Sequence, residues 1–422
     1  MKHKNHSLLI FILITLVCIP QASIGLYIPS LPHMVEALHT NSNELQFTLS
    51  IYMIGYAFST LVCGIFSDRY GRKPVLLAGL SIYLFATIIC LIASNVYVLI
   101  IGRFLQALGG CCGTVLARVI AKDTFESKDQ VRILTYLSTA IAITPAIAPI
   151  LGGYLEFYFS WRSGFLILSF ISLMALLLCM FGLKETNAHK DLKATNFVSI
   201  VNNYKYLLTH RLFLTYSISI GLAWCAYYSF IQSSSFVFQN IFKVTPIVYG
   251  GMYAVVISGY ILGTIFTRRY SNKIGINNVI MYESLLALGA AIVMLFIMHV
   301  NSGALIGILL PMAIIMIGIG GIFPACQAAV MQPFTHIAGT ASGLFFFIQM
   351  IFGAICGLIL GIFHVHSQAP MVVTITFSCS LLVLVFYSLI WKNSKHSPQY
   401  NAKKYTECSQ YKVKKRHQKV PE

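Results

Sequence analysis

Twelve stretches of mainly apolar residues follow one another along this chain and limit what it can fold into. A helix needs about 20 apolar residues to cross the hydrocarbon core of a membrane, and the chain supplies that length repeatedly. The stretches begin near Leu8, Phe47, Val75, Tyr97, Leu134 and Phe165, and then near Leu212, Tyr249, Val279, Ala304, Ala341 and Met371. Their number and length predict an all-α membrane protein with twelve transmembrane helices.

The low charge content excludes a soluble protein. Only 10% of the residues are charged, whereas soluble domains carry about 25%. Backbone that faces lipid must satisfy its own hydrogen bonds, and the stretches are too long and too continuously apolar for barrel strands. We therefore expect every stretch to be a helix.

The basic residues indicate how the helices are oriented. With the N-terminus placed in the cytoplasm, 26 of the 29 Lys and Arg residues fall in inside segments, and only Arg162 and Lys243 fall outside. This bias is the positive-inside signature, and it predicts that both termini are cytoplasmic. We expect the basic tail to rest on anionic lipid and not to bind nucleic acid.

The two halves of the chain contain a repeat at an offset of 200 residues. Five residues after the second span recur identically after the eighth span, namely Ile65, Phe66, Arg69, Tyr70 and Lys73. The repeat predicts two six-helix bundles with pseudo-two-fold symmetry, which can rock about a site at their interface. The expected segments are an N-terminal bundle (1–185), a cytoplasmic linker (186–211), a C-terminal bundle (212–391) and the basic tail (392–422).

The strongest local motif is the segment 64–74, GIFSDRYGRKP, between the second and third spans. Gly64 and Gly71 permit close approach and a tight turn, and Asp68 can accept hydrogen bonds from a neighbouring Arg. The basic residues of the motif anchor the loop in the cytoplasm; they are Arg69, Arg72 and Lys73.

This motif resembles the GxLaDrxGrkxxl signature of the major facilitator superfamily. In that family the loop latches the two bundles together in the outward-open state, and the resemblance implies this role for Asp68 and Arg72. The second copy carries Arg268 where Asp68 stands, so we expect the latch to be asymmetric.

The fourth span contains an arginine. Arg103 and Gln106 are three residues apart and therefore share a helix face, and a charged side chain within a span is by default a candidate for function. The segment resembles the family's lxxxRxxqGxgaa motif, with Ala107 in place of one Gly. The resemblance implies a role in proton transfer or in holding a substrate anion, whereas a structural arginine is the alternative.

The fifth span carries TPAIAPILGG, residues 144–153, which resembles the gxxxGPxxGG motif of antiporters in this family. Pro145 and Pro149 are expected to bend the helix, and Gly152 and Gly153 to let another helix approach closely. The resemblance implies that this element seals the interface between the bundles against leak. A helix that is only kinked and well packed is the alternative.

Further short segments, including the Tyr27–Pro32 stretch, make the chain similar to the bicyclomycin/chloramphenicol-resistance group of drug:proton antiporters. That group commonly carries an Asp four residues before the Pro of the first helix, and this chain has Gly25 there. The carboxylate best placed inside a span is Glu283, which we take as a coupling candidate with Arg103 and Gln106. We favour a structural interpretation in which Glu283 pairs with Arg269 or Lys273.

Polar and aromatic residues at helical spacing are the candidates for the substrate cavity. An apolar lining with a few donors suits amphipathic small molecules, although such stripes also serve packing. The candidates are Tyr27, Tyr52, Tyr56, Trp224, Tyr228, Gln232 and Gln349. The eleven cysteines contain no CxxC pair, so we expect them to pack as small apolar side chains and not to form disulfides or metal sites.

Together these features predict a secondary active transporter of the bacterial inner membrane, acting as a monomer without cofactor or metal. The expected activity is proton-coupled efflux of drugs or small amphipathic metabolites. Export of a siderophore or peptide, and uptake by symport, are the alternatives within transport. A polytopic enzyme or a receptor is the alternative outside it, but no clustered catalytic constellation is present in the sequence and no GxxxxGK[ST] loop occurs.

Overall fold

In the part of the chain that the structure describes, twelve long helices form two bundles, as the sequence predicts. The structure, a computed structural model, describes residues 2–187, 197–300, 305–334, 337–363 and 367–391. The predicted basic tail (392–422) and part of the predicted linker (188–196) lie outside the described residues. Within the described part, twelve helical segments are long and apolar enough to cross a membrane.

The N-terminal bundle contains six long helices and one short helix. The short helix α2 (Leu31–Ala37) and the 3-10 turn η1 (Ile28–Ser30) extend the first span. The long helices are α1 (Lys2–Gly25), α3 (Ser42–Tyr70), α4 (Arg72–Leu91), α5 (Val96–Thr124), α6 (Ser127–Tyr158) and α7 (Trp161–Gly182).

The C-terminal bundle repeats this arrangement, and helix α8 (Phe197–Thr209) precedes it. Two π-helical segments, η2 (Val237–Ile241) and η4 (Tyr387–Trp391), extend its first and last helices. The long helices are α9 (Arg211–Phe236), α10 (Pro246–Ile274), α11 (Ile276–Val300), α12 (Ile306–Met331), α13 (Ala338–Leu360) and α14 (Ala369–Phe386).

Local sequence signals fix several helix ends. Asn41 and Asn95 cap α3 and α5, because each side chain accepts a hydrogen bond from the backbone N–H three residues later. Gly71 separates α3 from α4 with a φ of 110°, and Gly275 separates α10 from α11 with a φ of 87°. Side chains rarely tolerate this backbone region, so the two halves use the same kind of glycine turn at corresponding places.

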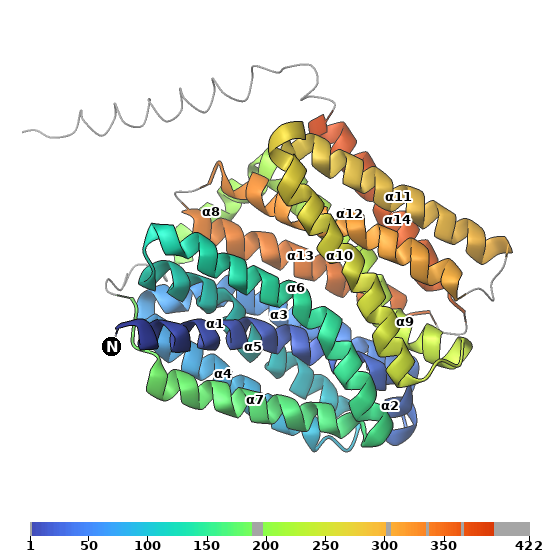
Figure 1. The fold of residues 1–422 in the computed structure, drawn as a ribbon, viewed down its shortest axis with the longest axis horizontal. Helices are drawn as coiled ribbons and strands as arrows, with labels where there is room; N and C mark the ends of the chain where they lie inside the picture. The colour runs from blue at the N-terminus through green and yellow to red at the C-terminus, as the bar shows by residue number, and fades with distance from the viewer. Residues whose placement is uncertain (1, 188–196, 301–304, 335–336, 364–366, 392–422) are drawn as a thin grey trace, which may run out of the picture.

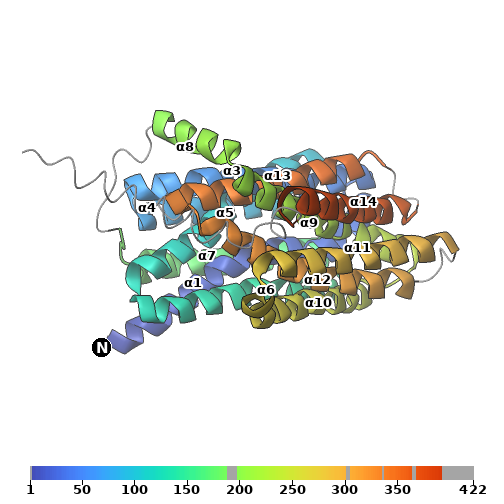
Figure 2. The same cartoon turned by 90° about the horizontal axis from the view of Figure 1, so that it is seen from above.

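The bundles meet along two seams. Helix α3 packs against α13, and α6 packs against α10, as Figure 1 shows for the neighbouring ribbons. Helix α8 lies at the edge of the molecule (Figure 2) and contacts α9 and α13. We call the end of the molecule that carries α8 and the turn at Gly71 the linker end, and the end that carries η1 and α2 the far end.

One prediction about the cysteines is wrong. Cys63 of α3 and Cys112 of α5 form a disulfide, with Cα atoms 5.7 Å apart. They are 49 residues apart in sequence, a separation that gives no signal of pairing, and they meet because α3 and α5 pack together within the N-terminal bundle. The other cysteines of the described residues are free, and all of them except Cys18 are buried.

Candidate functional site

Arg103 lies fully buried in the middle of the N-terminal bundle, with 0% of its surface exposed. Its guanidinium carbon lies 4.5 Å from the ring centre of Tyr27 and 4.2 Å from that of Tyr52. The guanidinium donates hydrogen bonds to the Ser23 carbonyl oxygen at 3.1 Å and to Gln106 Oε1 at 2.7 Å. The structure thus places two predicted cavity residues and the predicted partner Gln106 around this cation.

The charge of Arg103 is not neutralised. Its Nε and Nη2 atoms have no hydrogen-bond partner, and no carboxylate in the described part of the chain pairs with it. Neighbouring hydrogen bonds hold the surroundings rigid: Gln106 donates to Thr87 at 2.9 Å, and the Tyr27 hydroxyl pairs with Thr48 at 2.6 Å. A buried cation with free donors can receive an anionic group.

Glu283 is the corresponding buried acid in the C-terminal bundle, where 4% of its surface is exposed. It accepts a hydrogen bond from the Thr267 hydroxyl at 2.5 Å, and its Oε2 has no partner. The favoured pairing with Arg269 or Lys273 is wrong, because no ion pair joins these residues within the described ranges. The Thr267 hydroxyl on α10 is the partner instead.

Gly321 of α12 provides the space for this carboxyl group. A Cβ atom at Gly321 would lie 1.9 Å from Glu283 Oε1, a distance that atoms do not tolerate. The carboxyl group therefore fills the volume that a side chain of α12 would otherwise occupy, between α10, α11 and α12.

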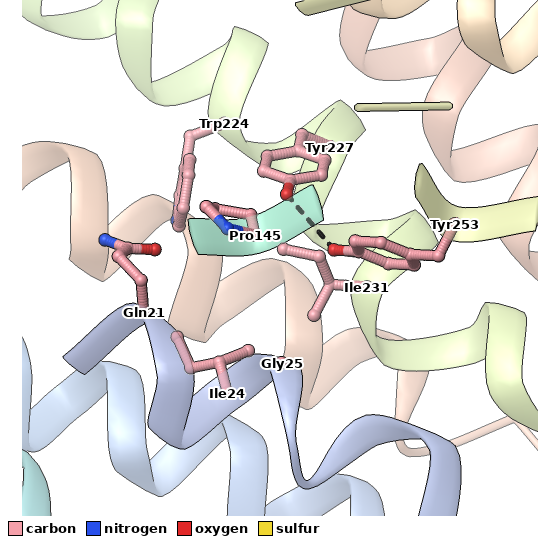
Figure 3. Close-up of a pocket in the computed structure, with 8 residues that line it drawn as sticks. All are labelled: Gln21, Ile24, Gly25, Pro145, Trp224, Tyr227, Ile231 and Tyr253. Atoms are coloured by element: carbon pink, nitrogen blue, oxygen red, sulfur yellow. Dashed lines mark hydrogen bonds between the residues drawn. The ribbon is translucent and has the colours of Figure 1, made fainter. Parts of the chain in front are cut away.

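A small central cavity lies between the bundles (Figure 3). It holds about 20 Å³, which is room for about one water molecule, so the site is closed to larger ligands in this conformation. Residues of α1 and α6 line one side, and residues of α9 and α10 line the other. The lining residues are Gln21, Ile24, Gly25, Pro145, Trp224, Tyr227, Ile231 and Tyr253.

The sequence identified this cavity in part. Trp224 was a cavity candidate, and Pro145 was assigned to the interface seal, but Tyr227 and Tyr253 were missed. Their hydroxyls are 3.1 Å apart and hydrogen bonded across α9 and α10. Residues 224, 227 and 231 also share one face of a helix. This second grouping of α9 residues was the sequence signal that could have located Tyr227.

The remaining cavity candidates pack around this centre. Tyr228 stacks on Trp224 with ring centres 6.3 Å apart, and Tyr56 is buried on α3. Gln232 donates to the Gly357 carbonyl at 2.7 Å and accepts from Ser50 at 3.4 Å, which links α9 to α13 and α3. The last candidate is Gln349, which is buried on α13 with an unpartnered Oε1.

Direct packing between the bundles closes the far end. Gln239, just after α9, donates to the Pro29 carbonyl oxygen in η1 at 2.8 Å. The glycines of the predicted seal lie against backbone: a Cβ at Gly152 would lie 2.7 Å from the Leu26 oxygen, and one at Gly153 would lie 2.3 Å from the Pro246 oxygen. Helix α6 therefore fits between α1 and α10 with no room for side chains at these positions.

Gly25 belongs to the same packing. A Cβ at this position would lie 2.5 Å from the Ala148 Cβ and 3.1 Å from Pro149 Cδ. The bent segment of α6 thus occupies the space that a carboxylate would need. In this conformation, Gly25 is a site of close helix packing.

Gly250 and Gly251 offer a matched test of this seal. A Cβ at Gly250 would lie 2.5 Å from the Pro149 oxygen, whereas a Cβ at Gly251 would meet nothing within 4 Å. We expect Gly250→Ala to destabilise the closed far end by about 1–3 kcal/mol through overpacking and to lower the Tm of the purified protein. Gly251→Ala should leave the Tm unchanged or raise it, and equal Tm values for the two variants would contradict this account of the seal.

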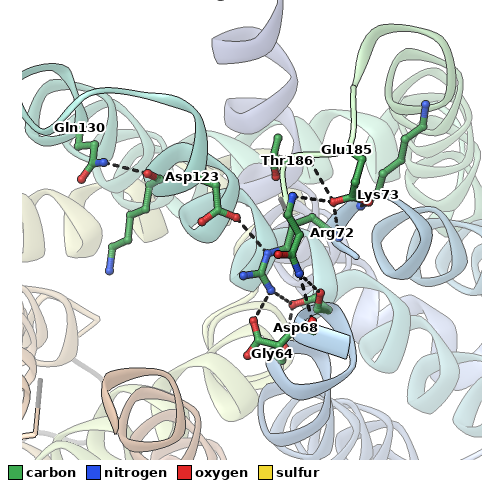
Figure 4. Close-up of polar contacts among 11 residues, drawn as sticks. Gly64, Asp68, Arg72, Lys73, Asp123, Gln130, Glu185 and Thr186 are labelled. Atoms are coloured by element: carbon green, nitrogen blue, oxygen red, sulfur yellow. Dashed lines mark hydrogen bonds and ion pairs between the residues drawn. The ribbon is translucent and has the colours of Figure 1, made fainter. Parts of the chain in front are cut away.

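The predicted latch motif forms contacts within the N-terminal bundle (Figure 4). Arg72 pairs with Asp68, donates to Asp123 Oδ2 of α5 at 3.0 Å and donates to the Ser67 hydroxyl at 2.8 Å. These bonds join the adjacent ends of α3, α4 and α5. The implied contact of Asp68 and Arg72 with the other bundle stays a prediction for another conformation.

Glu185, which follows α7, ties that helix to the same motif. Its carboxylate accepts backbone hydrogen bonds from Arg72 at 2.9 Å and Lys73 at 3.2 Å, at the start of α4, and Lys73 Nζ donates to the Met180 carbonyl. Partial burial alone would raise the pKa of Glu185, but its backbone N–H donors outweigh that effect and hold the pKa below its ordinary value. No role was assigned to Glu185 from its sequence context, although its position just after a span was an available signal.

Comparison with known proteins identifies the family. Residues 13–358 match the sequence profile of the Major Facilitator Superfamily. The chain belongs to this family. It is 27% identical over 400 residues to a bicyclomycin resistance protein homolog of Haemophilus influenzae, which covers 93% of this chain and 99% of the relative. It is 26% identical over 402 residues to multidrug resistance protein D of Escherichia coli, which covers 93% and 98%.

Solved structures of transporters share the fold of this family member. A bacterial homolog of the lysosomal transporter Spinster, in an inward-facing conformation, aligns with a TM-score of 0.72 at 14% identity over 92% of this chain and 98% of that chain. A D-xylose-proton symporter aligns with a TM-score of 0.68 at 16% identity over 90% and 97%. These likenesses show the fold. As a member of the Major Facilitator Superfamily, the chain is a multi-pass membrane transporter and not an enzyme, and the resemblance seen in its motifs is confirmed.

Proposed function

We propose that this protein exports drugs or small amphipathic metabolites in exchange for protons, by rocking its two bundles about the central cavity. The linker end faces the cytoplasm of a bacterium, and the far end faces outward across the inner membrane. The segments 1–185 and 212–391 move as the two bundles, and 186–211 connects them. The sequence relatives support the efflux part of this proposal, because their names refer to drug resistance.

The observation that carries proton coupling is the buried carboxyl group of Glu283. It has a hydroxyl partner and no cation, and an isolated buried carboxylate is costly inside a membrane. The group therefore carries a proton in this conformation and loses it when the C-terminal bundle rearranges. Thr267 and Gly321 hold the carboxyl group in place whether it is protonated or ionised.

Arg103 supplies the second element of the mechanism. Its charge lies within the N-terminal bundle without a counter-ion, whereas Glu283 is neutral when protonated and becomes a buried charge only when the proton leaves. A substrate in the cavity compensates the charge of Arg103 in one state, and the polar groups of α1 and α5 compensate it in the other. Because each charge favours a different arrangement of the bundles, binding of proton and substrate alternate, as exchange requires.

Everted membrane vesicles that contain the protein test this function. An imposed pH gradient, acid inside, should drive accumulation of a substrate identified by growth under toxic compounds, and collapse of the gradient with an ionophore should release it. Accumulation that is equal with and without the gradient would contradict proton coupling. Accumulation only when the gradient is reversed would indicate uptake by symport instead.

A further inference from the structure

A second cation lies on the same helix as Arg103, between the bundles and nearer the linker end. Arg118 follows Arg103 by 15 residues on α5, which places the two about 22 Å apart and within about 60° of one helix face. By sequence Arg118 belongs to an inside segment, but in the structure it lies within α5 and is half-buried. The Thr114 side chain occupies the same face between the two arginines.

An aromatic side chain of the other bundle contacts Arg118. Its guanidinium carbon lies 5.5 Å from the ring centre of Phe346, which is on α13 of the other bundle. Such a ring attracts cations and also provides apolar surface, so the guanidinium lies beside an apolar face where the two bundles meet.

No acid balances these two arginines. Arg118 forms no hydrogen bond or ion pair with the residues that the structure describes. Glu283 is turned inward among α10, α11 and α12. A ligand between the bundles would therefore meet two guanidinium groups that no carboxylate of the described residues pairs with.

We propose that Arg118 is the entry site for the negative charge of the substrate, and that the substrates are amphipathic organic anions with a carboxylate or a similar group. The anion binds first at Arg118, with its apolar part against the Phe346 ring, and moves along α5 to Arg103. Half-burial leaves Arg118 accessible, and the absence of a bound acid leaves its donors available to a ligand. This inference rests on the proposed function as an exporter.

Binding of three matched naphthalene compounds to the purified full-length protein tests the inference. The probes are naphthalene-2-carboxylate, the neutral naphthalene-2-carboxamide and the cationic naphthalen-2-ylmethylammonium, each radiolabelled and measured by scintillation proximity. The carboxylate should bind at least about tenfold more tightly than the other two, since a charge-assisted hydrogen bond is stronger than a neutral one. Equal affinities, a preference for the ammonium compound, or no binding of any probe would overturn the inference.

Variants at Arg118 assign the preference to this residue. Arg118→Gln should weaken carboxylate binding by about tenfold while carboxamide binding stays unchanged, and Arg118→Lys should keep most of the preference. Arg162→Gln, outside the path, should behave like the wild type. If Arg118→Gln keeps the full preference, or if both Arg118 variants lose both ligands, the assignment is wrong.

Transport of the same probes separates this inference from the proposed function. If the protein shows the carboxylate preference but no pH gradient drives movement of any probe, the proposed coupling fails and the role of Arg118 stands. If a pH gradient drives the carboxamide or the ammonium compound and not the carboxylate, the exporter stands and the role of Arg118 fails.

Discussion

Arg103→Gln is expected to lower the rate of efflux by about a hundredfold or more, because it removes the only fully buried cation near the central cavity in the described structure and the charge-assisted hydrogen bonds that it can form with substrate. The folded protein should tolerate the change. Two of the guanidinium nitrogens already lack partners, and a buried charge without a counter-ion does not stabilise the fold. Rates of efflux and the Tm of the purified protein measure both effects.

The efflux rate and the Tm of Arg103→Gln together distinguish a functional arginine from a structural one. A structural arginine would give a variant with a lower Tm and a loss of activity in proportion to the loss of folded protein. We expect instead a Tm within a few degrees of the wild type and almost no transport. Arg162→Gln is the matched control, because Arg162 makes one hydrogen bond to the Ala93 carbonyl far from the cavity, and it should retain transport. Wild-type efflux by Arg103→Gln would refute the assignment.

Glu283→Gln is expected to abolish the dependence of transport on a pH gradient while exchange of labelled for unlabelled substrate continues. The amide has nearly the same shape as the carboxyl group and can still pair with Thr267, but it cannot bind and release a proton. Counterflow in proteoliposomes at equal pH measures exchange, and efflux under an imposed gradient measures coupling.

Two control variants make this result specific. Thr267→Val removes the hydroxyl partner and keeps the carboxyl group, so it should shift the pH dependence of efflux and not abolish the coupling. Glu36→Gln alters an acid that is exposed at the far end and should leave both assays unchanged. If Glu283→Gln still shows full gradient-driven efflux, another group carries the proton.

Sequence patterns predicted the fold of this protein well because membrane insertion imposes strong rules. Span length, the bias of basic residues and the repeat around Arg69 and Arg269 all depend on local sequence. The glycine turn at Gly71 is likewise readable, since its positive φ excludes most other residues. These features predicted twelve helices in two bundles.

The details of the site depend on contacts between helices that are distant in sequence. Glu283 could have reached Arg269 or Lys273 by spacing along the chain, and only the packing of α10, α11 and α12 shows that Thr267 and Gly321 surround it. Arg118 lies within α5 because this helix extends past the apolar part of its sequence. The pairing of Cys63 with Cys112 also results from tertiary packing.

The central claim is exchange of substrate for protons, and proton movement driven by substrate alone tests it most directly. Proteoliposomes with a pH-sensitive dye inside are prepared at equal pH on both sides and given an outward gradient of substrate. Exchange predicts that protons enter as substrate leaves and that the interior becomes acidic, with no acidification in the Glu283→Gln variant. Substrate efflux without any change of internal pH, or with alkalinisation, would contradict the account.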